Sequence, residues 1–187
     1  MVSEARFVGL DAGRDKIEAS VRPTGEIWST QSGYNGMTQV AETLFGIQPQ
    51  LVALQANGNF ELPLAGILLT FGLPVALVQP RKVREFARAI GKLGRVEQKP
   101  AGLLAQFAEF VKPEMRPLPE DLVEELKHLR ARRTEILEMI ALERSRCGNS
   151  IPTRDRDVQA HIHFMERSLA SIDAKFSRQV RASRIWH

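Results

Sequence analysis

Short apolar runs separated by turn residues characterise the first two thirds of the chain. Three such runs close to the amino terminus predict strands, and turn residues at Gly13 and at Pro23 to Gly25 separate them. Because the connections are short, the three strands are expected to form a meander. The predicted strands cover residues 6–11, 17–22 and 26–30.

Helices and strands then alternate along the chain. Two apolar runs predict further buried strands, and apolar residues at helical spacing predict four helices. Up to residue 90 the order is βββαβαβα, which is typical of ribonuclease-H-like folds with helices on the faces of a mixed sheet. We therefore predict an α/β protein of this class. The two strands cover residues 51–55 and 75–78, and the helices cover residues 37–45, 60–71, 81–90 and 101–111.

The pattern changes after Pro113, Pro117 and Pro119, a cluster that indicates a domain boundary. Beyond it, apolar residues recur four and three apart in two segments, as in a coiled-coil seam, with an interruption at Arg133. The seam residues are Leu122, Leu126, Leu129, Ile136 and Ile140 in the first segment, and Val158, Ile162, Met165, Leu169, Ile172 and Phe176 in the second.

The turn at residues 147–152 allows two arrangements of these segments. They are expected either to fold back as an antiparallel hairpin or to pair with another chain, and two to three heptads do not decide the oligomeric state. We predict three parts in total. They are a ribonuclease-H-like domain over residues 1–112, a proline-rich linker over 113–120, and a helical hairpin or coiled coil over 121–185.

The net charge of +4 is divided unevenly, with −3 in residues 1–79 and +7 in residues 80–187. Residues 80–119 hold nine basic and four acidic side chains, which fits a surface for phosphate backbones, although a solvated helix face is the alternative. Arg81, Arg84, Arg88 and Lys92 are three to four residues apart and are expected to share one helix face. The candidate nucleic-acid-binding residues are Arg81, Lys82, Arg84, Arg88, Lys92, Arg95 and Lys99.

Other signals of chemistry are weak. His161 and His163 are two apart on a predicted helix and point to different sides, which favours ordinary helix residues over a metal site. Cys147 has no second cysteine for a disulfide or a zinc site, and no GxGxxG or Walker-type lysine occurs. No run of 18 apolar residues and no signal-peptide pattern is present, so we expect a soluble, cytoplasmic protein.

Four segments, taken in order, resemble the DEDD-type, RuvC-like transposases of insertion sequences, the group that includes pilin-gene invertases. Residues 8–11 with 16–21 resemble the family's first two strands. Residues 51–60, LVALQANGNF, are similar to the family's second strand, where an acidic residue is followed by Ala-Thr-Gly and an aromatic residue. QPRKVREFARAIGKL at 79–93 resembles its Asn-Pro lead into a basic helix, and residues 95–107 take the place of its Lys-Thr-Asp-x-x-Asp-Ala motif.

The resemblance implies four acidic residues that hold two magnesium ions for phosphodiester transfer. Carried over position by position, they fall on Asp11, Gln55, Glu97 and Pro100, of which two are acidic. Magnesium prefers charged oxygens, whereas Gln55 offers a neutral carbonyl and Pro100 no side-chain ligand. The extra methylene of Glu97 moves its carboxylate by about 1 Å relative to aspartate. We expect Asp11 and Glu97 to be vestigial catalytic residues, Asp11 to bind metal weakly or not at all, and no cofactor to be needed.

Three other acids are possible substitute ligands. Asp15 follows the first strand in a turn, Glu18 lies in the second strand, and Glu61 comes six residues after Gln55 and would enter from the next helix. We do not expect these residues to restore the site, because magnesium tolerates little change in ligand geometry.

The resemblance also implies a second domain with a nucleophilic serine and a guiding bridge RNA, whereas this sequence stops at Trp186 and His187. We therefore expect a truncated transposase-like protein, related to DNA transposition and recombination, that binds DNA or structured RNA without an intact catalytic site. One alternative is a coiled-coil partner or inhibitor of a full-length transposase, acting as a homo- or hetero-oligomer through residues 121–185. The other is a remaining magnesium-dependent, DNA-cleaving transposase.

Overall fold

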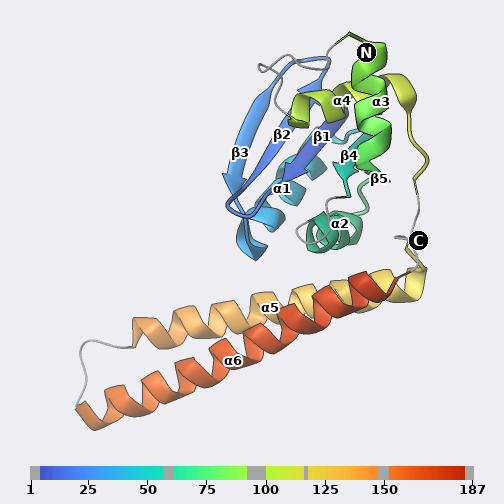
Figure 1. Ribbon diagram of the computed structural model, residues 1–187. Coiled ribbons are helices and arrows are strands. Elements are labelled where there is room, and N and C mark those ends of the chain that lie inside the picture. Colours follow the sequence, from blue (N-terminus) through green and yellow to red (C-terminus); the bar gives the residue numbers. More distant parts are fainter. Residues whose placement is uncertain (1–4, 57–60, 92–99, 116–117, 147–151, 184–187) are drawn as a thin grey trace. The chain divides into compact units, whose positions relative to one another are not determined.

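The chain forms two compact units, seen here in a computed structural model (Figure 1). The first unit comprises residues 1–119 with 183–187, and the second is Glu120–Ala182. The structure describes residues 5–56, 61–91, 100–115, 118–146 and 152–183.

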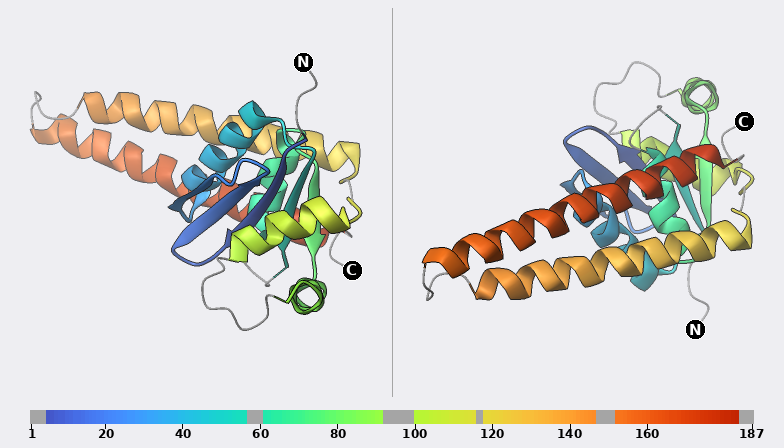
Figure 2. Two further views of the ribbon diagram at one scale, coloured as in Figure 1. Left: turned by 90° about the horizontal axis from the view of Figure 1, so that it is seen from above. Right: turned by 90° about the horizontal axis from the view of Figure 1, so that it is seen from below.

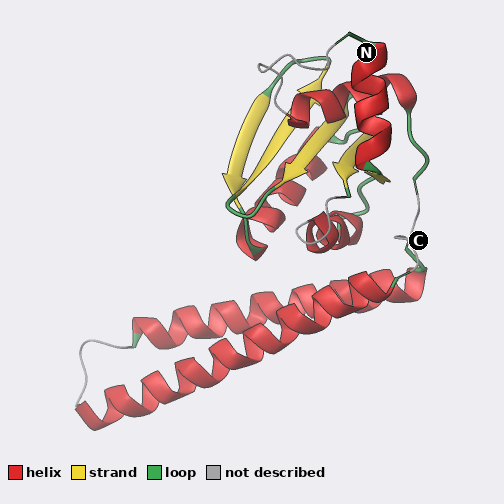
Figure 3. Ribbon diagram, viewed as in Figure 1, coloured by secondary structure: helices red, strands yellow, loops and turns green. Residues whose placement is uncertain are grey.

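A five-stranded mixed sheet forms the centre of the first unit (Figure 3). Its strands are β1 (Phe7–Ala12), β2 (Lys16–Arg22), β3 (Ile27–Gln31), β4 (Leu51–Gln55) and β5 (Val75–Val78). The first three strands pair antiparallel and form the predicted meander. β4 runs parallel to β1 on its other side, and β5 runs parallel to β4. The resulting order is β3-β2-β1-β4-β5.

Helices lie on the faces of this sheet. They are α1 (Tyr34–Ile47), α2 (Glu61–Thr70), α3 (Pro80–Ala89) and α4 (Pro100–Val111). Figure 2 shows α1 and α4 on opposite sides of the sheet, and α2 packs against α1. The rings of Phe86 in α3 and Phe107 in α4 meet edge to face, with centroids 5.4 Å apart. The strand order, strand directions and helix positions confirm the predicted ribonuclease-H-like fold.

The predicted elements all occur, and the largest difference is at the start of α1. This helix begins at Tyr34, whereas the apolar pattern predicts a start at residue 37. Met37 is the first buried residue of α1, so the preceding turn carries no apolar periodicity. A hydrophobic pattern therefore finds only the part of the helix that faces the core.

The central strand β1 is buried on both faces, which explains its almost continuous apolar sequence. Alternate residues of the sheet point to opposite faces. On the α4 face, Phe7 packs in a core cluster with residues of β4, β5, α3 and α4. The other members of this cluster are Leu51, Ala53, Ala76, Val78, Val83, Leu104, Phe107 and Ala108.

Gly9, in the middle of β1, allows α4 to lie directly on the strand. A Cβ atom at this position would lie 2.2 Å from the carbonyl oxygen of Ala101 and 2.2 Å from the amide nitrogen of Ala105. Both atoms belong to the backbone of α4, which cannot move away as a flexible side chain can. A residue without a side chain is therefore required at position 9 for this packing.

The second unit is a hairpin of two long helices, α5 (Glu120–Ser145) and α6 (Pro152–Ala182). Ile136 and Ile140 of α5 pack with Ile162 and Met165 of α6, as the predicted seam requires. Ion pairs join the two helices in antiparallel order at Arg133–Asp173, Arg144–Glu166 and Lys175–Glu125. Of the two expected arrangements, the segments take the one that folds back within the chain.

Arg133 interrupts the apolar seam because it forms an ion pair across the hairpin. Its side chain is 9% exposed, and its Nε lies 2.8 Å from Oδ1 of Asp173. A second contact of 3.5 Å joins Nη2 to Oδ2, so the guanidinium approaches the carboxylate with two nitrogens. A buried charge that is paired in this way favours one alignment of the two helices over shifted ones.

We expect the change Gly9→Ala to destabilise the first unit by roughly 2–3 kcal/mol, because the new methyl group overlaps the α4 backbone. Urea denaturation measures this loss. Gly102→Ala is the matched control, because a Cβ there meets only Ser20 Oγ at 4.0 Å. The control should be as stable as the wild type or more stable by up to about 1 kcal/mol. Equal stability of the two variants would contradict the packing argument.

Candidate functional site

Asp11 and Gln55 lie at the same edge of the sheet, near the carboxyl ends of two neighbouring parallel strands. The register pairs Leu10 of β1 with Leu54 of β4, and the same offset places Asp11 beside Gln55. Strand alternation puts both residues on the same face as Gly9, which α4 covers. The structure thus brings together two of the four positions at which the resemblance expects acids.

The fourth position, Pro100, is the exposed first residue of α4. It directly precedes Ala101, whose carbonyl oxygen approaches Gly9. The start of α4 therefore lies over Gly9 of β1, two residues before Asp11 in that strand. The third position, Glu97, lies outside the described residues.

A second carboxylate lies opposite Asp11 across the antiparallel β1–β2 pair. Asp11 and Glu18 are direct cross-strand partners. Lys16, two residues before Glu18 on β2, places its Nζ 2.7 Å from Glu18 Oε1. Burial raises the pKa of Asp11 above its ordinary value, the Glu18 carboxylate raises it further, and Lys16 lowers it. The environment as a whole therefore makes ionisation of Asp11 less favourable than it is in water.

The other two acids considered as substitute ligands lie elsewhere. Asp15 occupies the turn between β1 and β2, where its carbonyl oxygen accepts a hydrogen bond from the amide of Ser32 at 2.9 Å. Glu61 begins α2 and is 2% exposed, and α2 packs against α1. Since α1 and α4 lie on opposite sides of the sheet (Figure 2), Glu61 belongs to the helix layer away from α4.

The described residues do not fit the pair of magnesium ions that the resemblance implies. Burial opposes ionisation of Asp11, the Glu18 carboxylate is in contact with an ammonium group, and Gln55 offers only a neutral oxygen. Two divalent ions require several charged oxygens in near-octahedral geometry. Among the described residues, no group of three or more His, Cys, Asp or Glu side chains is placed to hold a metal ion.

The basic helix α3 begins at Pro80, a residue that favours the first position of a helix. Val83 and Ala87 are buried against the rest of the unit. The opposite face is strongly polar, and its basic residues are exposed. They are Arg81, Lys82, Arg84 and Arg88.

Helix α3 ends at Ala89, so Arg81, Arg84 and Arg88 are the members of the expected row that lie on it. The exposed face also carries an acid. Nε of Arg81 lies 2.8 Å from Oε1 of Glu85, a residue that the sequence-based prediction did not single out. Lys92, Arg95 and Lys99 lie outside the described residues.

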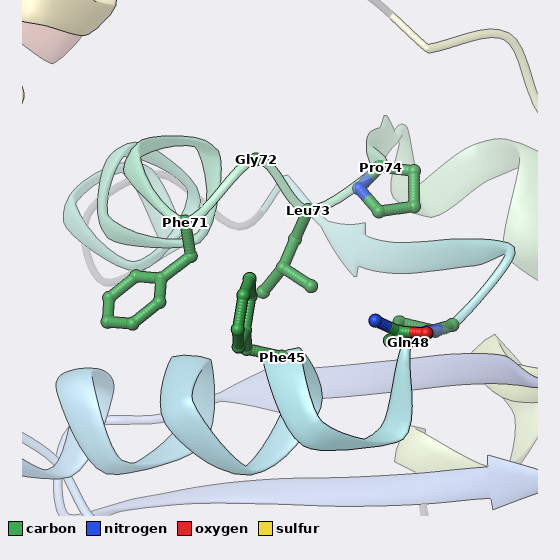
Figure 4. A pocket seen from close by; sticks show the side chains of 7 residues that line it. Phe45, Gln48, Phe71, Gly72, Leu73 and Pro74 are labelled. Atoms are coloured by element: carbon green, nitrogen blue, oxygen red, sulfur yellow. The ribbon is translucent and has the colours of Figure 1, made fainter.

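A small hollow of about 210 Å³ lies at the opposite end of the strands β4 and β5 (Figure 4). It is formed where α1 ends and where the turn after α2 leads into β5. The rings of Phe45 and Phe71 border it, with centroids 6.3 Å apart. Ligands of open α/β sheets bind beyond the carboxyl ends of parallel strands, which is the edge of Asp11 and Gln55. We therefore do not assign the hollow to the site.

His161 and His163 are both exposed on α6. Nδ1 of His161 lies 3.1 Å from Oε1 of Glu143, an acid on the facing helix α5. Lone histidines with a single carboxylate neighbour are ordinary surface residues, as we expected for His161 and His163. Separately, none of the helices in the described part of the chain has the length and apolar character needed to cross a membrane.

No protein-family model matches the chain, and no curated protein matches it. Solved structures do match, and one of them is that of T. thermophilus RuvC in complex with a Holliday junction substrate. The alignment covers 65% of this chain and 87% of that chain, with 16% sequence identity and a TM-score of 0.38. At this level the similarity concerns the fold alone, and our assignment of the fold depends on the strand order and directions.

We expect Asp11→Asn to raise the free energy of unfolding at pH 7. The raised pKa of Asp11 means that the unfolded chain loses its proton first as the pH rises. Stability therefore falls as the pH rises through the ordinary value of 3.8 towards the folded value, and asparagine avoids this loss. Chemical denaturation from pH 3 to pH 7 checks the sign. The gain in stability should disappear below pH 3.8, the ordinary pKa of aspartate. An Asp11→Asn variant that is no more stable than the wild type at pH 7 would contradict the prediction.

Proposed function

We propose that this chain binds DNA or RNA through the exposed basic side chains of α3, and that it is related to DNA transposition and recombination proteins without cutting DNA itself. The observation that carries the proposal is the strongly polarised helix α3, which buries Val83 and Ala87 and exposes four basic residues. The ordered resemblance of four segments to DEDD-type transposases supports the relation to transposition. The unfavourable ligand set around Asp11 supports a binding role over a cleaving one.

The geometry of α3 suits a phosphate backbone. Arg81, Arg84 and Arg88 are spaced three and four residues apart, so they form a row along one side of the helix. Basic side chains in such a row contact phosphates whatever the base sequence, and each contact releases counterions. The buried side of α3, including Phe86 against Phe107, holds the helix on the sheet unit. The row is therefore presented on a rigid support.

Glu85 opposes this binding, because it places a negative charge within the basic face and pairs with Arg81. Both side chains are largely exposed, at 82% for Arg81 and 55% for Glu85, so the pair contributes little to folding. A phosphate must displace the carboxylate to reach Arg81. Replacing Glu85 should therefore strengthen binding.

We predict that Arg84→Ala with Arg88→Ala weakens binding of a duplex or a structured RNA roughly tenfold. The slope of log affinity against log salt should fall by about 2, since each lost phosphate contact removes about 0.9. Glu85→Gln should act in the opposite direction and steepen the slope by about 1. Fluorescence anisotropy titrations at several salt concentrations between about 50 and 200 mM measure the affinity and its dependence on salt.

The matched control replaces Arg167 and Arg178 by alanine, since both are exposed arginines of α6, outside the basic helix. Binding that stays unchanged in this control and falls in the α3 variant supports the proposal. An equal loss in both variants would indicate diffuse attraction by the net positive charge. The absence of any binding at low salt would reject the proposal altogether.

A second candidate function is partner binding through the hairpin. Because its apolar seam is closed within the chain, a partner would need the outer surface. Among the described residues of the hairpin, three large apolar side chains are exposed, Met139 at 38%, Leu142 at 55% and Phe164 at 58%. The partner class that the resemblance suggests is a DEDD-type transposase with a complete acidic set, whose activity the mixed complex would inhibit.

We predict that Leu142→Glu with Phe164→Glu abolishes co-purification with such a transposase and leaves the hairpin folded, because both side chains are already in solvent. Ala170→Glu places the same charge at another exposed position of α6 and should leave the complex intact. Circular dichroism checks that the helices persist. A complex that survives the double change, or that survives deletion of residues 120–182, does not form through the hairpin.

A further inference from the structure

The carboxylates of Asp11 and Glu18 belong to directly opposite residues of the β1–β2 pair. In such a pair the Cβ atoms lie about 4.5–5.5 Å apart, and like charges destabilise the sheet. Glu18 is only 12% exposed, and Asp11 is partly buried, so water screens their repulsion incompletely. The pair therefore requires a positive charge close to it.

Lys16 supplies a positive charge at this place. It lies on the same face of β2 as Glu18, two residues earlier, and its Nζ is 2.7 Å from Oε1 of Glu18. The lysine side chain is 63% exposed, so its ammonium approaches the pair from the solvent side. Asp11 is the direct cross-strand partner of Glu18 on this face, so the charge of Lys16 acts on both carboxylates.

We propose that Lys16 is the counter-cation of the Asp11–Glu18 pair, so that a side chain of this protein takes the place that a divalent metal ion would otherwise have. A lysine ammonium and a metal ion compete for the same carboxylate oxygens. The lysine is attached to the same strand, and its effective concentration there is high. This inference rests on the proposed loss of the metal site and is independent of nucleic-acid binding by α3.

The test measures binding of Mn²⁺, an ion that prefers oxygen ligands, to the full chain by electron paramagnetic resonance. Lys16→Gln should bind Mn²⁺ about tenfold more tightly than the wild type, because a nearby positive charge no longer repels the ion. Adding Glu18→Gln to that variant should return the affinity to the wild-type level. Lys16 is exposed, so its replacement leaves the packing of the sheet unchanged.

Arg81→Gln is the matched control, because it also breaks an exposed ion pair but leaves Glu85 as the single acid of α3. It should not change the Mn²⁺ affinity. Equal Mn²⁺ affinity of the wild type and Lys16→Gln would overturn the proposal, as would an equal gain in the control.

Duplex binding by Lys16→Gln, measured on the same sample, should match the wild type. A wild-type protein that binds no nucleic acid would contradict the proposed function alone.

Discussion

The contact between the α4 backbone and Gly9 governs the arrangement of the first unit. Helices normally rest on a sheet through side chains, whereas here the carbonyl of Ala101 and the amide of Ala105 lie against the strand itself. Phe107 of α4 in turn receives Phe86, so the basic helix α3 is held on a helix that has little freedom to shift. The same close approach covers the sheet face on which Asp11 lies, and burial is the main cause of its raised pKa. The close approach that Gly9 allows thus affects both the support of the basic helix α3 and the burial of Asp11.

Much of this fold is predictable from the sequence, since each strand of the sheet core appears as a short apolar run. The bounds of β4 and β5 agree with the prediction because these parallel strands are buried and end in polar or turn residues. The role of Gly9 is not predictable, because a glycine within a strand pattern does not show which element approaches it. Arg133 is a similar case, since only the pairing of α5 with α6 brings Asp173 to it, 40 positions away in the chain.

The candidate site was predictable only in part. Asp11 and Gln55 follow apolar runs of parallel strands, and the carboxyl ends of such strands meet at one edge. The sequence-based prediction missed the pairing of Lys16 with Glu18, and the position of Glu18 opposite Asp11 depends on the antiparallel register of β2 against β1. The alternation of Lys16, Ile17 and Glu18 was the available signal, because it places both charged residues on one face of a strand. For α3, the predicted basic residues Arg81, Arg84 and Arg88 lie on one described helix, which ends at Ala89.

The two positions that depart from the expected acids carry residues that lower the free energy of this fold. Proline at the first position of a helix has no amide hydrogen to leave unpaired, and its fixed φ suits the helix start, so Pro100 favours the beginning of α4. An acid at position 55 would add a third carboxylate beside Asp11 and Glu18, where burial already disfavours the charged form of Asp11. Gln55 keeps a polar side chain there without the charge. Active sites commonly sacrifice stability for a strained set of charges, and neutral residues at these two positions avoid that cost.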